Sequence, residues 1–143
     1  MDIIAISIAI LALLVSFFFS FFNLFYSRLN KLSDHITEID KIMVKNPELL
    51  SIFCNEEMEK NRSDISFSNR MSAFILLHFN VFESAYFQVL SKRTMFFSKQ
   101  KSAWNNFISV IFKTNFVNEM WGQYKKLYDE NFTKYIDTIR DSS

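Results

Sequence analysis

The chain has 143 residues, half of them hydrophobic and 18 of them phenylalanine, with a formal net charge of only +1. This charge balance disfavours a dedicated nucleic-acid-binding domain, and the single cysteine, Cys54, excludes an intrachain disulfide and a multi-cysteine zinc site. One glycine and one proline provide few turn residues for a sheet, so the sequence predicts an all-α protein.

The first predicted element is an apolar helix. Residues 3–26 form a run of 24 residues without a charge, and a helix of that length, about 36 Å, could cross a hydrocarbon core of ~30 Å. The run is too long for a cleaved signal peptide, and neither a basic segment before it nor a small-residue cleavage site after it is present. We therefore expect a retained transmembrane anchor at residues 1–26 and a cytoplasmic helical domain at residues 27–143.

Basic residues after the apolar run predict its orientation. Arg28, Lys31, Lys41 and Lys45 follow it, and no Lys or Arg precedes it. The positive-inside rule then places the C-terminal side in the cytoplasm. We expect a single-pass protein of the cell inner membrane whose N-terminus is outside and whose C-terminal domain is cytoplasmic.

One side of the predicted anchor carries small or weakly polar residues at helical spacing. They are Ala5, Ala9, Ala12, Ser16, Ser20, Asn23 and Ser27, and we call them the small-residue stripe. Such a stripe allows two helices to approach closely and to hydrogen-bond across their contact. The stripe therefore predicts a face for self-association or for a partner membrane helix, although Ala and Ser are also common in membrane helices without such a role.

The anchor is predicted to continue into a bundle of about four to five helices. The first covers residues 27–45 and carries a heptad seam made of Leu29, Leu32, Ile36, Ile39 and Met43. The second covers residues 47–60, with Asn46 as its cap, Pro47 at its first position, and its apolar side chains packed inward. The third begins near Ser66 or Ser68 and ends near Ser91.

The third predicted helix is apolar nearly all round and carries a few polar residues. Because Asn80, Glu83 and Gln88 lie within it, we expect the central helix of a bundle and not a second membrane span. We predict a buried polar network of His78, Asn80, Glu83 and Tyr86, in which Asn80 and Glu83 bond to Trp121, a tyrosine or Arg70. The alternative is a ligand or catalytic pocket around a perturbed Glu83.

Residues 91–102 are predicted to form a loop. Its cations and aromatic residues are Lys92, Arg93, Phe96, Phe97, Lys99 and Lys101. Bulky apolar side chains between cations are typical of a segment that contacts an anionic membrane surface, and a solvated loop with Phe tucked into the core is the alternative. Two helical stretches follow, at residues 103–113 and 116–140, and Gly122 and Asp129 could interrupt the second.

The order of these parts resembles a known group of proteins. The residues that carry the resemblance are Asn46-Pro47-Glu48-Leu49, Ile52-Phe53, His78-Phe79-Asn80, Glu83, Tyr86, Trp104, Trp121, Phe132 and Tyr135-Ile136. This arrangement resembles small bacterial single-pass membrane proteins with a cytoplasmic helical domain of unknown function. The resemblance implies an architecture and no activity.

The leading interpretation is a membrane-anchored helical interaction and oligomerisation protein without enzymatic activity. One glycine cannot form a phosphate-binding loop, and neither a catalytic triad nor a set of metal ligands is legible, so we expect no catalytic residue, cofactor or metal. The expected partners are membrane lipid and a second copy or a partner membrane helix. A protein partner in the cytoplasm is left open, and no nucleic acid is expected.

Two other functions stay open at this stage. An oligomer of the anchor could line a pore, because the small-residue stripe continues as Lys31, Asp34, Glu38 and Lys41. By analogy of layout, such a protein would be a membrane-disrupting effector of a bacterial anti-phage defence system. The other alternative is a HEPN-like ribonuclease, whose Arg and His would be Arg28 with His35, or Arg70 with His78.

Overall fold

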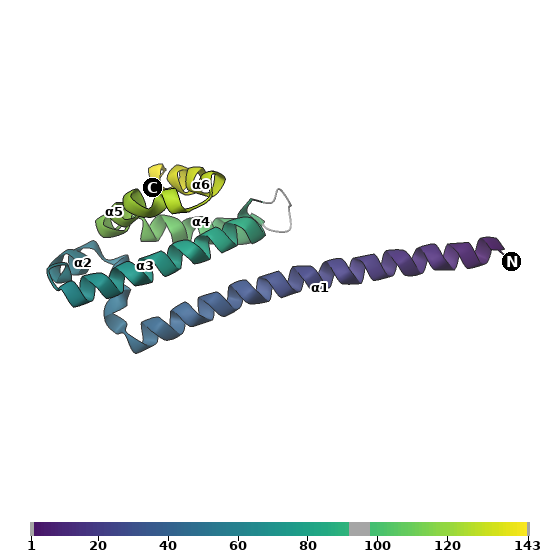
Figure 1. The fold of residues 1–143 in the computed structure, drawn as a ribbon, viewed down its shortest axis with the longest axis horizontal. Coiled ribbons are helices and arrows are strands. Elements are labelled where there is room, and N and C mark those ends of the chain that lie inside the picture. Colours follow the sequence, from purple (N-terminus) through teal and green to yellow (C-terminus); the bar gives the residue numbers. More distant parts are fainter. Residues whose placement is uncertain (1, 92–97, 143) are drawn as a thin grey trace. The chain divides into compact units, whose positions relative to one another are not determined.

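The computed structural model describes residues 2–91 and 98–142, and every regular element in these ranges is a helix (Figure 1). The α-helices are α1 (Asp2–Lys45), α2 (Asn55–Asn61), α3 (Ile65–Ala85), α4 (Ser98–Ile111), α5 (Asn115–Tyr124) and α6 (Glu130–Asp141). Two 3-10 helices, η1 (Pro47–Phe53) and η4 (Lys125–Leu127), and a π-helix, η2 (Tyr86–Leu90), complete the set. The prediction of an all-α protein is confirmed.

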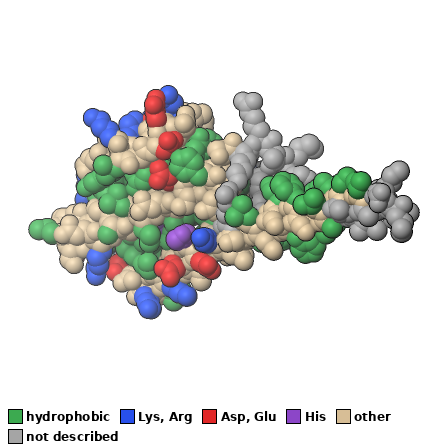
Figure 2. Space-filling view, turned by 45° about the vertical axis from the view of Figure 1, so that its right-hand side comes forward, with side chains coloured by type: hydrophobic (Ala, Val, Ile, Leu, Met, Phe, Trp, Pro, Cys, Tyr) green, Lys and Arg blue, Asp and Glu red, His purple; other side chains and the backbone are tan. Residues whose placement is uncertain are grey.

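The chain divides into two compact units, the first ending at Asp34 and the second beginning at His35. In the first unit, α1 exposes large apolar side chains at nearly consecutive positions between Ile10 and Leu24, several of which are visible in Figure 2. Leu13 and Phe17, for example, are 70% and 68% exposed. Because consecutive helical residues point in directions about 100° apart, these side chains cover the helix surface except the side that carries Ala12, Ser16, Ser20 and Asn23.

Among the described residues, one helical stretch is long and apolar enough to cross a membrane. It is Ile65–Leu90, in the middle of the chain, and half of it is buried within the structure. The central helix of a globular domain passes the same test. Among the described side chains of α1, the corresponding apolar stretch is Ile10–Leu24, which is shorter.

The second unit is built around α3 and η2. Phe79 and Phe82 of α3 are fully buried, as are Ile108 of α4, Trp121 of α5 and Phe132 of α6. Aromatic rings form much of the core: the Phe79 and Trp121 rings meet edge to face with their centroids 5.1 Å apart, and Trp121 stacks on Tyr128 at 5.7 Å. Each such pair adds about 0.5–1.5 kcal/mol beyond the area that it buries.

Aspartates begin two of the core helices. The carboxylate of Asp64 accepts hydrogen bonds from the backbone N–H groups of Ser66 and Phe67, at 2.8 and 3.2 Å, and so caps α3. Asp129 caps α6 in the same way through Asn131 and Phe132, at 2.9 and 3.1 Å. These bonds satisfy backbone donors that the first helical turn leaves free.

The segment after α1 differs from the single helix predicted for residues 47–60. It forms the 3-10 helix η1, breaks at Cys54, and resumes as α2. The repeat of three residues in a 3-10 helix places Leu49 and Ile52 in the core and leaves Leu50 half exposed. Asn46 does not cap the following helix, because its Nδ2 instead donates to the Ile42 carbonyl, 2.9 Å away, at the end of α1.

One other predicted boundary was wrong, and one of the two possible interruptions of the last helix is absent from α5. α4 begins at Ser98, five residues before the predicted start at residue 103, and Gly122 lies inside α5 without interrupting it. Asp129 does separate two helices, as expected, because its side chain caps α6.

Candidate functional site

The four residues predicted as one buried polar network lie on different sides of α3 and η2. His78 is fully buried, whereas Asn80 is exposed and Glu83 is half-buried. His78 and Asn80 are two positions apart, so their side chains point about 200° apart around the helix. The predicted network is therefore wrong as a single buried cluster.

Asn80 and Glu83 instead hold the segment that enters α6. The Tyr128 hydroxyl donates to Asn80 Oδ1 at 3.1 Å, and the Asp129 backbone N–H donates to Glu83 Oε1 at 3.0 Å. Burial and the nearby Glu83 carboxylate both raise the pKa of Tyr128, so its hydroxyl stays protonated and donates. Neither Trp121 nor Arg70, two of the predicted partners, takes part in these bonds.

Tyr86 belongs to the aromatic core. Its ring lies 5.7 Å from Phe132 and 5.1 Å from Tyr135, measured between ring centroids. The hydroxyl of Tyr135 donates to Asn105 Oδ1, which joins α6 to α4. Tyr86 therefore packs against rings of α6, whereas Asn80 and Glu83 form hydrogen bonds with the segment that precedes α6.

His78 is the buried polar residue of α3 whose hydrogen bonding is incomplete. Its Nδ1 lies 2.9 Å from the Phe74 carbonyl oxygen, and that oxygen can only accept, so Nδ1 carries the proton. Burial lowers the pKa of His78 against the opposing effect of this bond, so the ring is neutral and Nε2 is a bare acceptor. Nε2 is buried and has no hydrogen-bond partner among the residues that the structure describes.

An apolar cavity of about 320 Å³ adjoins His78 within the second unit. Its lining comes from Ile36, Ile39, Asp40 and Met43 of α1, His78, Val81 and Phe82 of α3, and Ala103, Trp104 and Phe107 of α4. The side chains around His78 are largely aromatic: the ring centroids of Phe74, Phe82 and Phe107 lie 4.4, 6.0 and 6.2 Å from that of His78. This volume is at the small end of ligand pockets, which measure roughly 300–1,000 Å³.

Sequence reasoning did not predict this cavity. It identified the heptad seam that contains Ile36, Ile39 and Met43, and the apolar character of the third helix. The space between three helices depends on how their side chains fit together, and periodicity carries no information about that fit. The one usable signal was His78 itself, a polar side chain in an apolar helix.

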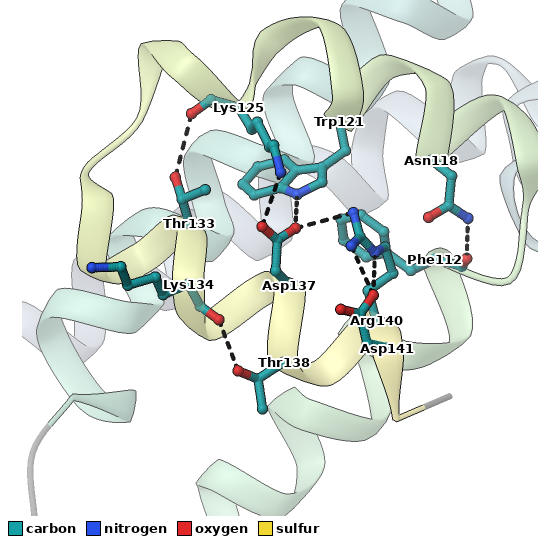
Figure 3. Close-up of polar contacts among 10 residues, drawn as sticks. All are labelled: Phe112, Asn118, Trp121, Lys125, Thr133, Lys134, Asp137, Thr138, Arg140 and Asp141. Atoms are coloured by element: carbon teal, nitrogen blue, oxygen red, sulfur yellow. Dashed lines mark hydrogen bonds and ion pairs between the residues drawn. The ribbon is translucent and has the colours of Figure 1, made fainter.

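A second polar cluster, centred on Asp137, was also missed. Its carboxylate accepts hydrogen bonds from the Trp121 indole at 2.9 Å and from Lys125 Nζ at 3.0 Å, and it pairs with Arg140 at 3.0 Å (Figure 3). Burial raises the pKa of Asp137, but the bonds from Trp121 and Lys125 and the charge of Arg140 outweigh it, so the pKa lies below its ordinary value. The cluster ties α6 to α5 and η4, which is a structural role.

The other predicted surfaces are only partly covered by the described residues. The stripe residues Ala12, Ser16, Ser20, Asn23 and Ser27 are exposed on α1, whereas the side chains of Ala5 and Ala9 lie outside the described set. In the predicted membrane-surface loop, Lys92, Arg93, Phe96 and Phe97 also lie outside it. Lys99 and Lys101 lie in the first turn of α4 and not in a loop, because that helix begins at Ser98.

The structure describes the side chains of three of the four residues considered for ribonuclease chemistry. His78 has no solvent-exposed surface, so it cannot exchange a proton with a bound RNA in this structure. Arg70 forms an ion pair with Glu48 at 3.7 Å. His35 is exposed on α1, and the side chain of Arg28 lies outside the described set.

Comparison with models of protein families, with curated proteins and with solved structures found no significant match. The functional argument therefore rests on the residues of this chain.

Proposed function

We propose that this chain is a membrane-anchored helical interaction protein that associates with copies of itself through the stripe on α1. The observation that carries the proposal is the run of exposed apolar side chains between Ile10 and Leu24. Exposing apolar surface to water costs about 25 cal/mol per Å², and lipid removes this cost on every side of the helix at once. The uncharged run of residues 3–26 is long enough for this role.

Basic residues support the orientation of the anchor. Arg28, Lys31, Lys41 and Lys45 follow the apolar run, so the second unit would lie in the cytoplasm and residue 2 outside. The burial of half of Ile65–Leu90 supports a single span, because a core helix packs its apolar side chains against protein and not against lipid. The second unit then presents its surface to the cytoplasm.

The small-residue stripe supports self-association. Ser16, Ser20 and Asn23 place hydroxyl and amide groups on the same side of α1 as Ala12, all with exposed side chains. In lipid such groups gain from hydrogen bonds across a close helix contact, by about 0.6–2 kcal/mol each. Lipid, which is as apolar as the Phe side chains of the opposite face, offers those groups no hydrogen bond.

Fractionation and reporter fusions test the anchor. We expect the full chain to remain in the membrane pellet after alkaline carbonate extraction, and a C-terminal fluorescent reporter to be active while a C-terminal alkaline phosphatase is inactive. Release by carbonate would contradict the anchor. An active phosphatase would contradict the orientation and would indicate that Ile65–Leu90 also crosses the membrane.

Paired substitutions test self-association. Ser16→Leu with Ser20→Leu should lower the oligomeric fraction of the full chain in mild detergent, measured by cross-linking and by light scattering, because leucine separates the backbones and removes the hydroxyl groups. The matched control is Phe18→Leu with Phe22→Leu on the opposite face, which should leave the oligomer unchanged. A monomeric wild-type chain, or equal effects of the two pairs, would contradict self-association through the stripe.

A further inference from the structure

The cavity beside His78 combines an apolar lining with a buried hydrogen-bond acceptor. Its walls are aliphatic and aromatic, with Ile39, Val81, Phe82 and Phe107 among them. One wall contains His78, whose Nε2 accepts no hydrogen bond from the described residues. Leaving a buried acceptor unpaired destabilises the folded state, so the core gains from any group that satisfies it.

We propose that this cavity binds a small neutral molecule with an apolar body and one hydroxyl group, which donates its hydrogen bond to His78 Nε2. The Phe74 carbonyl holds the proton on Nδ1 and so keeps Nε2 as the acceptor. A ligand without a donor would fill the same space and leave Nε2 unpaired. The cavity should therefore bind apolar molecules that carry a hydroxyl group more tightly than those that lack one.

The charge and size of the ligand follow from the lining. Among the described lining residues, Asp40 is the charged one, and its carboxylate repels an anionic ligand. The other described residues of the lining offer no cation to an anion, since His78 is neutral and the rest are uncharged. A volume of 320 Å³ suits a compact ring or a short chain and excludes a whole membrane lipid.

Access to Nε2 requires small side-chain movements. His78 has no exposed surface, and Phe82 and Phe107 lie edge to face with their centroids 5.7 Å apart beside it. Ala103 lies at the exposed edge of the cavity and presents little bulk there. A ligand therefore reaches Nε2 past the exposed edge at Ala103, after the rings of Phe82 and Phe107 change rotamer.

Phenol and anisole form a matched pair of probes, because both are neutral aromatic molecules and only phenol donates a hydrogen bond. The chain contains two histidines, so labelling with ¹⁵N-histidine gives resonances from His78 and His35 alone, and exposed His35 serves as an internal reference. The full chain in detergent would be titrated with each probe. His35→Gln assigns the two sets of signals.

We expect phenol to move the Nε2 resonance of His78 toward the frequency of a hydrogen-bonded nitrogen, while the His35 resonances stay in place. Anisole at the same concentration should leave the Nε2 resonance where it is. A phenol effect of equal size on both histidines, no effect on His78, or an equal effect of anisole would overturn the proposal. A shift of Nε2 that depends on protein concentration alone would also overturn it and would identify a second copy of the chain as the occupant.

Two variants locate the binding. Ala103→Phe fills the edge of the cavity and should weaken the apparent affinity for phenol by at least about tenfold, whereas Ser102→Phe, at the exposed neighbouring position outside the lining, should not. The far-ultraviolet circular dichroism spectrum and thermal midpoint of each variant confirm folding, because both positions are on the surface of α4. Equal affinities in the two variants would overturn the site.

Discussion

At the scale of the residue, one carboxylate of the second unit binds three other side chains. Asp137 of α6 accepts from Trp121 and Lys125 and pairs with Arg140, and its side chain is only 25% exposed. Hydrogen bonds to a charged group contribute about 1.5–3 kcal/mol, more than the exposed pair of Lys134 with Glu130 on the same helix can supply. Trp121 itself is fully buried, so the bond also satisfies an indole N–H that water cannot reach.

Replacing Asp137 should therefore lower stability in a pH-dependent way. Asp137→Asn removes the charge and should reduce the free energy of unfolding by about 1–2 kcal/mol at neutral pH, measured by urea denaturation. Because the pKa of Asp137 is lower in the folded than in the unfolded state, the stabilisation is present above the unfolded pKa and is lost as pH falls through the folded pKa. The difference in the free energy of unfolding between wild type and Asp137→Asn should therefore become smaller at acidic pH.

The control for this prediction is Glu130→Gln. It removes an acid of the same helix whose ion pair with Lys134 is largely exposed, and it should change stability little at any pH. If the difference in the free energy of unfolding between wild type and Asp137→Asn stayed constant with pH, the charge of Asp137 would not contribute to stability.

At the scale of the element, side-chain caps and one π-helix decide where helices begin and end. Asp64 and Asp129 cap α3 and α6, and the backbone N–H of Ser91 donates to the Tyr86 carbonyl at 2.9 Å, the wider bond of a π-helix. The start of α6 is held twice, because the backbone N–H of its cap, Asp129, donates to Glu83 of α3. The cap thus places α6 on the core as well as starting it.

Removing this cap should destabilise the second unit. Asp129→Ala loses the bonds to the N–H groups of Asn131 and Phe132, and we expect a loss of about 1 kcal/mol in the free energy of unfolding. Asp129→Asn retains a capping oxygen and should remain close to wild type. The measurement is thermal and urea denaturation by circular dichroism, and equal losses in both variants would show that the charge and not the capping bond matters.

At the scale of the whole molecule, the two units differ in whether their large apolar side chains are exposed or buried. The first exposes apolar side chains, whereas the second buries large ones such as Trp121, Phe79 and Phe132 around α3. The second unit includes the end of α1, since Ile39 is buried and lines the cavity. The folded unit therefore begins within a helix and not at its end.

Truncation tests this boundary. A chain of residues 35–143 should be helical and unfold cooperatively, because it keeps the whole core of the second unit. A chain of residues 46–143 loses the contacts of Ile39, whose full burial contributes about 1.5–3 kcal/mol, and should melt at a lower temperature. Equal melting temperatures would mean that the end of α1 does not belong to the folded unit.

Local sequence information predicted the secondary structure better than the site. Hydrophobic periodicity and the scarcity of glycine and proline indicated helices throughout, and Asp129 was identified as a break. The same information assigned Asn80 and Glu83 to the core and Leu50 to a buried helical face, and these positions are exposed or half exposed. The errors arise because the sequence of a largely apolar helix does not show how the helix is rotated about its axis. Without an evident polar face, no local pattern indicates which side packs against the core.

The sequence by itself determined that the chain is helical and that its first 26 residues contain an uncharged run long enough for a membrane, because both properties depend on neighbouring residues. Only the tertiary structure decided that His78 lies beside an apolar cavity, with no partner for its Nε2 among the described residues, and that Asp137 is the partner of Trp121. Those features join segments 16 or more residues apart, such as Trp121 with Asp137 and His78 with Phe107. Their geometry comes from the packing of whole helices, which no local pattern encodes.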